Sequence, residues 1–267
     1  MPKTHQLKTG TQVDLADCST SGSDFHDERS AAEKEFKQLR RQFIEQQHAW
    51  YAEGRRKLLI VLQAMDAGGK DGTIRLMTRG VNPQGVRVTS FKKPSSRELS
   101  RDYLWRVHRF VPRAGMIGIF NRSHYEDVLV VRVNRIVPES VWRARYEQIN
   151  QFEKLLSETG TTILKFFLHI SKEEQKERFQ DRLDEPDKHW KFSLDDLEKR
   201  KQWEDYMAAY EDALTRCTTS WAPWYVIPAD QKWYRNLAIM RVIVDTVNGL
   251  NPQFPEAEDG LDSVVIE

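Results

Sequence analysis

The sequence predicts an α/β protein whose core is a sheet of five parallel strands with helices on both faces. Three observations support this prediction. Short apolar runs alternate with segments in which apolar residues recur at helical intervals. The first apolar run ends in a glycine-rich turn that carries one lysine, which is typical of a phosphate-binding loop between a strand and a helix. At 267 residues the chain is long enough for one large α/β domain.

The first quarter of the chain should supply an arm, a helix and the first strand. Residues 1–29 are polar and are predicted to form an extended arm on the surface. Residues 30–54 place aromatic side chains among charges at helical intervals, and Gly54 should end this helix. Residues 58–62 are too apolar and too few for anything but a buried strand, and helical spacing resumes at residues 73–79.

The next elements repeat this alternation. Residues 82–85 predict a turn, and residues 86–91 predict the second strand. Residues 98–111 are expected to form one helix that ends before Pro112. The wholly apolar residues 115–120 should then form the third strand, which delivers a polar segment at its carboxyl end.

The second half continues in the same way. It predicts, in order, a helix at 139–159, a strand at 161–170, helices at 172–183 and 193–215, a strand at 224–227 and a helix at 231–250. Residues 184–192 are polar and irregular, as in a lid, and Ser193 with Asp196 offers an N-terminal cap to the helix that follows. The expected organisation is an arm (1–29), a P-loop domain (30–255) with a lid at about 178–200, and a tail (256–267).

The turn after the first strand has the composition of a phosphate-binding loop. Its glycines at 68, 69 and 72 let backbone amides approach phosphate oxygens, and Lys70 can reach across the phosphates. The match to G-x-x-x-x-G-K-[ST] is incomplete, because Ala64 replaces the first glycine and Asp71 replaces the magnesium-binding hydroxyl. A plain glycine turn with a solvated lysine is the alternative that the loop alone leaves open.

Positive charge concentrates around this loop. The whole chain has 41 Lys and Arg against 40 Asp and Glu, a formal net charge of +1, so no global field would recruit a polyanion. Residues 70–135, however, have 14 basic side chains against 5 acidic ones, whereas residues 136–267 have 17 against 25. The local excess therefore favours an anionic ligand at the predicted loop.

The cysteine content and the hydropathy pattern predict a cytoplasmic protein. Cys18 and Cys217 support neither a disulfide framework nor a cysteine metal cluster. The first ten residues lack the apolar core of a signal peptide, and no apolar run approaches the ~20 residues of a membrane span. We therefore expect neither secretion nor membrane insertion.

Acidic and basic side chains follow the strands whose carboxyl ends should meet at one edge. Asp66 lies within the loop, and Glu126 and Asp127 follow the third strand together with Arg122. Ligands of open α/β sheets bind at this edge, and carboxylates there can hold a divalent metal. With Lys70 beside them, these groups have the composition of a phosphoryl-transfer site. For each acid alone, a helix cap or a solvated group is the alternative.

Four longer motifs resemble the second family of polyphosphate kinases. They are Asp66-Ala-Gly-Gly-Lys-Asp-Gly72, Phe120-Asn-Arg-Ser-His-Tyr-Glu-Asp127, Lys188-His-Trp-Lys-Phe192 and Pro223-Trp-Tyr-Val-Ile-Pro-Ala-Asp230. The resemblance spans about residues 31–255 and is specific, because several long motifs occur in order. It implies a three-layer P-loop kinase fold with a helical lid, Mg²⁺ dependence with Mn²⁺ as a substitute, inorganic polyphosphate as donor and a nucleotide as acceptor.

The segment after the third strand resembles the class III branch of that family, which phosphorylates both AMP and ADP. This branch is identified by Asn121 together with Glu126 and Asp127. Many members have an aspartate where Asn121 offers a neutral oxygen, so the metal ligands are expected to be Asp66, Glu126 and Asp127. The resemblance implies polyphosphate, AMP, ADP and ATP as partners, and we expect a homo-oligomer, either a dimer or a tetramer, that binds neither nucleic acid nor membrane.

The resemblance also assigns roles to individual residues. The expected catalytic residues are Asp66, Lys70, Arg122, Glu126 and Asp127. The expected phosphate contacts are Ala67, Gly68, Gly69, Lys70, Asp71, Gly72, Thr73, Lys92, Lys93, Arg122 and Arg132. The lid should contribute Arg178, Arg182, Lys188, Trp190 and Lys191. Ordinary surface ion pairs are the alternative for the arginines among them.

Two rival functions share much of this pattern. An ATP-using nucleoside monophosphate kinase would have the same fold and most of the same phosphate contacts, so only the donor separates it. A non-catalytic module that binds polyanions such as nucleic acid would use the basic segment at residues 70–135. Such a module has no need for Asp66, which favours an enzyme.

Overall fold

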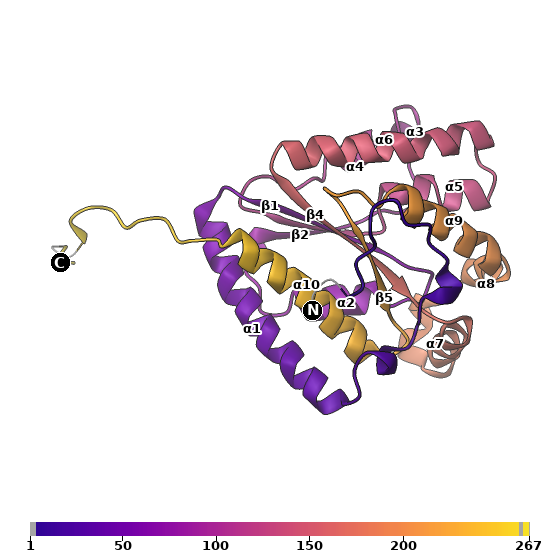
Figure 1. The fold of residues 1–267 in the computed structure, drawn as a ribbon, viewed down its shortest axis with the longest axis horizontal. Helices are drawn as coiled ribbons and strands as arrows, with labels where there is room; N and C mark the ends of the chain where they lie inside the picture. The colour runs from indigo at the N-terminus through magenta and orange to yellow at the C-terminus, as the bar shows by residue number, and fades with distance from the viewer. Residues whose placement is uncertain (1–3, 262–263, 267) are drawn as a thin grey trace.

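A parallel five-stranded sheet forms the centre of the molecule, as the sequence predicts (Figure 1). The computed structural model describes residues 4–261 and 264–266; residues 1–3 of the expected arm and residues 262, 263 and 267 of the expected tail lie outside it. The strands are β1 (Lys57–Gln63), β2 (Val86–Ser90), β3 (Ile117–Asn121), β4 (Thr161–His169) and β5 (Trp224–Pro228). Their order in the sheet is β2-β3-β1-β4-β5.

The strand register brings several strand ends to one edge. Leu62 of β1 and Ser90 of β2 both lie opposite Asn121, the last residue of β3. Gln63, the last residue of β1, lies opposite Phe167 of β4. β1 is buried along almost its whole length, as expected for a central parallel strand covered on both faces. The loops that follow β1, β2 and β3 therefore start side by side.

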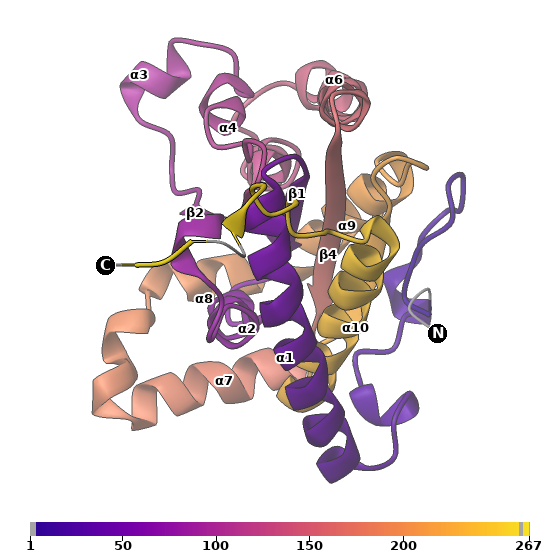
Figure 2. The ribbon, with the colours of Figure 1, turned by 90° about the vertical axis from the view of Figure 1, so that its left-hand side faces the viewer.

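Helices cover both faces of the sheet, which makes a three-layer α/β P-loop kinase fold (Figures 1 and 2). One face carries α1 (Arg29–Glu53), α2 (Lys70–Met77) and α10 (Lys232–Leu250), and the other carries α5 (Val130–Val133), α6 (Glu139–Glu158) and α9 (Trp203–Arg216). The segments α7 (Lys172–Asp184), η5 (Pro186–Lys191) and α8 (Leu194–Lys201) lie at the carboxyl edge of the strands. The fold class predicted from the sequence is confirmed.

The segment expected to be one helix at residues 98–111 consists of two short helices. These are α3 (Ser96–Leu99) and α4 (Trp105–His108). The Asp102 carboxylate accepts hydrogen bonds from the backbone N–H groups of Leu104 (3.0 Å) and Trp105 (2.8 Å). These hydrogen bonds form a turn directly before α4, whose N-cap is Leu104, so the apolar pattern at residues 98–111 does not reveal the boundary.

The segment expected to be one helix at residues 193–215 is also divided, into α8 and α9. The backbone N–H of Gln202 bonds the carbonyl of Lys199 (3.1 Å), which ends α8 in a tight turn. Trp203 then begins α9 and is buried. Ser193 does cap α8, but it accepts from the N–H of Asp195 (3.2 Å). The helix therefore breaks at Gln202, between α8 and the buried Trp203, although the apolar periodicity of residues 193–215 continues across this point.

The N-terminal arm covers the β5 edge of the sheet. Gln6 forms an antiparallel bridge with Tyr225, and the backbone N–H of Leu7 donates to Trp224 (2.9 Å). Farther along the arm, the Thr20 hydroxyl donates to the carboxylate of Asp230 (2.7 Å). The arm therefore shields backbone groups at an edge that would otherwise be open to pairing. Within the described residues, no helix has both the length and the apolar character needed to cross a bilayer.

Candidate active site

A cleft of about 720 Å³ opens at the carboxyl edge of the sheet. Its walls are the loop after β1, the segments that follow β2 and β3, and the α7, η5 and α8 region. The residues predicted from the sequence that line it are Asp66, Ala67, Gly68, Gly69, Lys70, Asp71, Gly72, Lys92, Lys93, Arg122, Arg178, Arg182, Lys188, Trp190 and Lys191. Residues more than a hundred positions apart in the sequence therefore share one cavity.

The loop after β1 has the geometry of an anion-binding turn. Gly69 is the N-cap of α2 with φ 97°, and the helix begins at Lys70, three residues before the position expected from periodicity. Ala67 has φ 62°, a left-handed conformation that costs energy for a residue with a side chain. Gly69 and Lys70 at the start of α2 line the cleft, and a helix N-terminus there favours phosphate.

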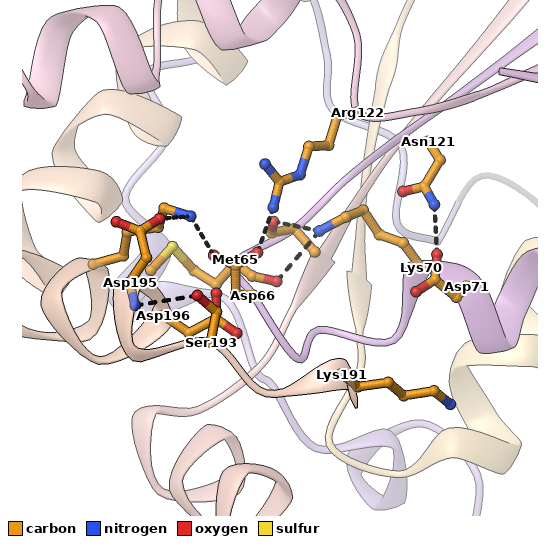
Figure 3. Close-up of polar contacts among 12 residues, drawn as sticks. Met65, Asp66, Lys70, Asp71, Asn121, Arg122, Lys191, Ser193, Asp195 and Asp196 are labelled. Atoms are coloured by element: carbon orange, nitrogen blue, oxygen red, sulfur yellow. Dashed lines mark hydrogen bonds and ion pairs between the residues drawn. The ribbon is translucent and has the colours of Figure 1, made fainter. Parts of the chain in front are cut away.

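Lys70 lies almost fully buried beneath the cleft. Its ammonium group donates to the carbonyls of Ala64 (2.8 Å) and Met65 (3.4 Å) (Figure 3). Burial first, and Arg122 second, lower the pKa of Lys70 to about 8. The amine is therefore mostly protonated near neutral pH and holds a positive charge within the loop.

Asp66 is held between two cations. Arg122 contacts its Oδ1 across 2.5 Å (Figure 3). Lys199 contacts its Oδ2 across 3.2 Å. Burial acts to raise the pKa of Asp66, but Arg122, Lys70 and Lys199 outweigh it and hold the pKa below its usual range. Arg122 reaches Asp66 from a left-handed backbone conformation, with φ 61°. The carboxylate is therefore charged at neutral pH, as a metal ligand must be.

The two acids after β3 face different surroundings. Both belong to the 3₁₀ segment η4 (His124–Asp127). Glu126 lines a small recess together with Ala64, Asp66 and Arg122, and burial raises its pKa. Asp127 instead pairs with Arg145 (3.0 Å) and lines neither the cleft nor the recess. Burial, opposed by Arg145, raises the pKa of Asp127 to about 6.

The expected set of three metal-binding carboxylates is thus not assembled. Among the described residues, no group of three or more His, Cys, Asp and Glu is arranged to hold a metal ion. The arrangement nevertheless fits Mg²⁺, because this ion is usually bound by one or two carboxylates and completes its coordination with waters and substrate phosphates. Asp66 and Glu126 border the same recess and provide such a pair.

Asp71, which stands where a P-loop usually has a hydroxyl residue, binds Asn121. The Asn121 amide donates to Asp71 Oδ1 (2.5 Å), so the end of β3 is tied to the start of α2 (Figure 3). A carboxylate in the first turn of a helix is favourable in itself. The pair of Asp71 and Asn121 therefore connects the two segments that form the floor of the cleft.

Two expected phosphate contacts lie outside the cleft. Arg132 pairs with Asp212 (2.6 Å) and donates to the Tyr146 hydroxyl (3.3 Å). Thr73 is buried in α2, and its hydroxyl has no hydrogen-bond partner among the described residues. Neither side chain lines the cavity. For Arg132, the ordinary ion pair describes its place in the structure.

Arg178 and Arg182 have different environments although both line the cleft. Arg178 is buried and donates to the carbonyls of Ala67 (2.9 Å), Ala229 (2.6 Å) and Asp230 (2.9 Å). It thereby fastens the phosphate loop to the end of β5. Arg182 is more exposed and donates to the carbonyl of Lys191 (2.9 Å). The Arg182 side chain contacts Lys191 and Asp196, which both belong to the expected lid, so these contacts would persist if the lid moved as a unit.

Sequence reasoning missed three basic residues at the site, and Lys232 of α10, which lines the cleft, is one of them. Lys199 contacts Asp66, but in the sequence it looks like one of several basic residues in the last turn of a helix, where such residues are common. Arg235 lies against Gly69 of the loop, and its exposed fraction is 2 %. A signal for Arg235 existed, since this arginine lies two residues before the apolar stretch 237–240 of α10.

Comparisons with known proteins point to one family. The sequence model of the family described as "Polyphosphate kinase 2 (PPK2)" matches residues 26–255. The chain is 56% identical over 245 residues to the "AMP/ADP-polyphosphate phosphotransferase" of Meiothermus ruber, which covers 92% of each chain. It is 43% identical over 268 residues to the "ADP-polyphosphate phosphotransferase" of Rhodopseudomonas palustris, which covers 95% of this chain and 93% of that protein.

A solved structure agrees with the sequence comparisons. The crystal structure of polyphosphate kinase 2 from Arthrobacter aurescens TC1 superimposes with a TM-score of 0.94 at 40% sequence identity. The match covers 98% of this chain and 94% of that one. The similarity therefore includes the sheet, the phosphate loop and the segments that border the cleft.

Proposed function

Because the chain belongs to the polyphosphate kinase 2 family, we propose that it transfers the terminal phosphoryl group of inorganic polyphosphate to AMP and to ADP, and so forms ADP and ATP. The charge of the cleft is the observation that supports this proposal best. Ten Lys and Arg line it against five Asp. A surface of this kind suits a donor that carries a negative charge on every phosphoryl unit, together with a phosphorylated acceptor.

The residues of the loop and Arg122 have different roles in phosphoryl transfer. An oxygen of the acceptor's terminal phosphate attacks the terminal phosphorus of polyphosphate, the phosphoanhydride bond breaks, and the shortened polyphosphate leaves with the bonding electron pair. The backbone N–H groups at the start of α2 hold phosphate oxygens, and Lys70 and Arg122 stabilise the negative charge that develops on the transferring group. In-line alignment of the two reactants supplies most of the remaining acceleration.

Asp66 and Glu126 are the residues that we propose for the metal. Their oxygens suit a hard divalent cation, and we assign Mg²⁺ as the ion, with Mn²⁺ as a substitute. When bound, the ion neutralises charge on the phosphates that meet in the cleft. Arg122 positions the Asp66 carboxylate through its contact with Oδ1. The other oxygen, Oδ2, becomes available to the metal when Lys199 moves away from it.

The lid, in this proposal, begins after Arg178. Arg182, Lys188, Trp190 and Lys191 line the cleft from α7 and η5, and their movement would exclude water before transfer. Arg178 remains with the loop, because three backbone carbonyls and Glu174 hold it. The homo-oligomer and the cytoplasmic location stay predictions from the sequence.

A donor assay tests the proposed function. The protein is incubated with AMP and Mg²⁺, and with either inorganic polyphosphate or ATP as donor, and the nucleotides are separated by chromatography. We expect ADP and then ATP with polyphosphate, and no products when EDTA is in excess. Turnover with ATP and AMP but none with polyphosphate would replace this function by that of an ATP-dependent nucleoside monophosphate kinase. Tight polyphosphate binding without any transfer would support the polyanion-binding module.

A further inference from the structure

Arg235 of α10 packs directly behind the phosphate loop. Its side chain is 2 % exposed. A methyl carbon added at Gly69 would lie 1.9 Å from Nη1 of Arg235, and one added at Gly72 would lie 3.8 Å from Nη2. The guanidinium group therefore lies against the loop at two of its glycines.

The surroundings of Arg235 leave its charge unbalanced. Its Nε and Nη2 donate to the neutral Asn236 side chain (3.2 and 3.0 Å), and Nη1 has no hydrogen-bond acceptor among the described residues. Glu174 is the acid that acts on it, but the Glu174 carboxylate already binds Nε of Arg178 (2.7 Å). Two guanidinium groups thus share one carboxylate beneath the loop, and a buried charge without a partner of its own is costly.

Arg235 remains a cation in this environment. Burial first, and Arg178 second, lower the pKa of Arg235 to about 9, so the group is still protonated at neutral pH. A protein that keeps such a charge buried at a ligand site gains when an anion arrives, because the attraction is strong where water is excluded. The anion that binds at this loop, in the function proposed above, is a phosphate group.

We propose that Arg235 is a positioning residue for phosphate. It acts as a fixed cation that attracts the phosphate chain bound at the loop, and its side chain packs against Gly69. The inference rests on the proposed function in one respect, that phosphates bind at this loop. The positive charge of Arg235 costs stability in the free protein and is balanced by the ligand. The Arg235 side chain therefore lowers the stability of the free protein and raises its affinity for phosphate.

The test uses inorganic tripolyphosphate as the probe and three variants of the full chain. Arg235→Met removes the charge and keeps an unbranched side chain, and Arg235→Lys keeps the charge. Arg241→Met is the matched control, because Arg241 lies on the same helix and pairs with Glu35 through two contacts of 2.6 Å, away from the cleft. Calorimetry gives the Kd for tripolyphosphate, and thermal unfolding gives Tm with and without it.

We expect Arg235→Met to weaken tripolyphosphate binding by about tenfold while Tm without ligand is unchanged or higher. Arg235→Lys should bind within about threefold of wild type. Arg241→Met should lower Tm and keep the wild-type Kd. The inference is overturned if Arg235→Met binds as wild type does, or if Arg235→Lys loses as much affinity as Arg235→Met. Absence of binding by the wild type would contradict the proposed function itself.

Discussion

Lys199 of α8 donates a hydrogen bond to Asp66 Oδ2 across 3.2 Å, and so connects the end of the expected lid to the phosphate loop. Lys199 also pairs with Asp195 (2.8 Å) on its own helix. An ammonium group and a divalent cation are alternative partners for one carboxylate oxygen. Metal binding at Asp66 therefore has to compete with Lys199, which makes α8 sensitive to the metal.

Removal of Lys199 should make the metal bind more tightly. In Lys199→Met, the Asp66 carboxylate has lost one of its two cations, so we expect half-maximal turnover at a Mg²⁺ concentration several-fold lower than in wild type. The measurement is initial rate against Mg²⁺ at fixed polyphosphate and ADP. Lys201→Met is the control, because Lys201 pairs with Glu198 on the exposed side of the same helix. An equal shift in both variants would assign the effect to net charge.

Charge removal in the loop should abolish transfer and preserve the fold. Lys70→Ala and Asp66→Asn each remove a group that acts on phosphates or metal, and loss of one such contact typically costs ~10²-fold or more in kcat. Far-UV circular dichroism should remain that of wild type. Turnover above about a tenth of wild type in both variants would remove these two residues from the catalytic assignment.

The local pattern of the sequence predicted what the backbone does in long regular segments. The five strands, α1, α6 and α10 lie where apolar periodicity and Gly54 indicate, because burial on one face decides both the pattern and the structure. The breaks at Asp102 and Gln202 escaped the prediction. They depend on a side chain that binds a particular N–H group and on the burial of Trp203, which periodicity does not encode.

The sequence predicted those site residues that directly follow a strand of the sheet. Asp66, Lys70 and Arg122 lie together because parallel strands bring their carboxyl ends to one edge. The partners of Arg132 and Asp127 were not predictable, since Asp212 and Arg145 come from other helices whose rotation the sequence does not fix. The roles of Lys199 and Arg235 depend on tertiary contacts in the same way.

Arg178 and Arg182 should respond differently to truncation. Arg178→Ala leaves the carbonyls of Ala67, Ala229 and Asp230 without a donor, so we expect a loss of about 3 kcal/mol in the free energy of unfolding together with a loss of turnover. Arg182→Ala should cost less than about 1 kcal/mol, because its ion pair with Asp196 is long (3.5 Å) and partly exposed, and should reduce turnover alone. Urea unfolding and kcat/KM measure the two effects. Equal stability losses would contradict this division.

The buried pair of Glu153 and Lys165 should set how stability depends on pH. Their side chains are fully buried and 2.6 Å apart. Burial acts to raise the pKa of Glu153, but Lys165 and His124 outweigh it and hold the pKa below its usual range. A carboxyl group with a lowered folded-state pKa stabilises the protein above its unfolded-state pKa, and this stabilisation is lost as the pH falls.

Lys165→Met should reverse that dependence. Without the ammonium group, burial raises the pKa of Glu153 above its unfolded value, so the variant should lose about 3 kcal/mol at pH 7 and less at pH 5, where the carboxyl group can take up a proton. Urea unfolding at both pH values measures the difference. The double variant Lys165→Met with Glu153→Gln should show no such dependence. A loss in Lys165→Met that is the same at both pH values would contradict the assignment.

Glu126 should decide between AMP and ADP as acceptor. It borders Asp66 and Arg122 in the recess beside the cleft, where a second carboxylate can hold the metal or orient the shorter nucleotide. AMP lacks the β-phosphate, so its α-phosphate has to reach the transferring group, and a misplacement of ~1 Å can cost ~10²-fold in rate. We therefore expect Glu126→Asn to lower kcat/KM for AMP at least tenfold more than for ADP, an effect of about 1.4 kcal/mol.

The neighbouring acid provides a matched control for this change in selectivity. Asp127→Asn makes the same substitution one residue later, at a side chain that pairs with Arg145 outside the cleft, so it should leave the ratio of AMP to ADP activity unchanged. If Glu126 only caps the segment after β3, its substitution would lower Tm and scale both activities together. The ratio of the two kcat/KM values, compared between wild type and both variants, separates a selectivity residue from a cap.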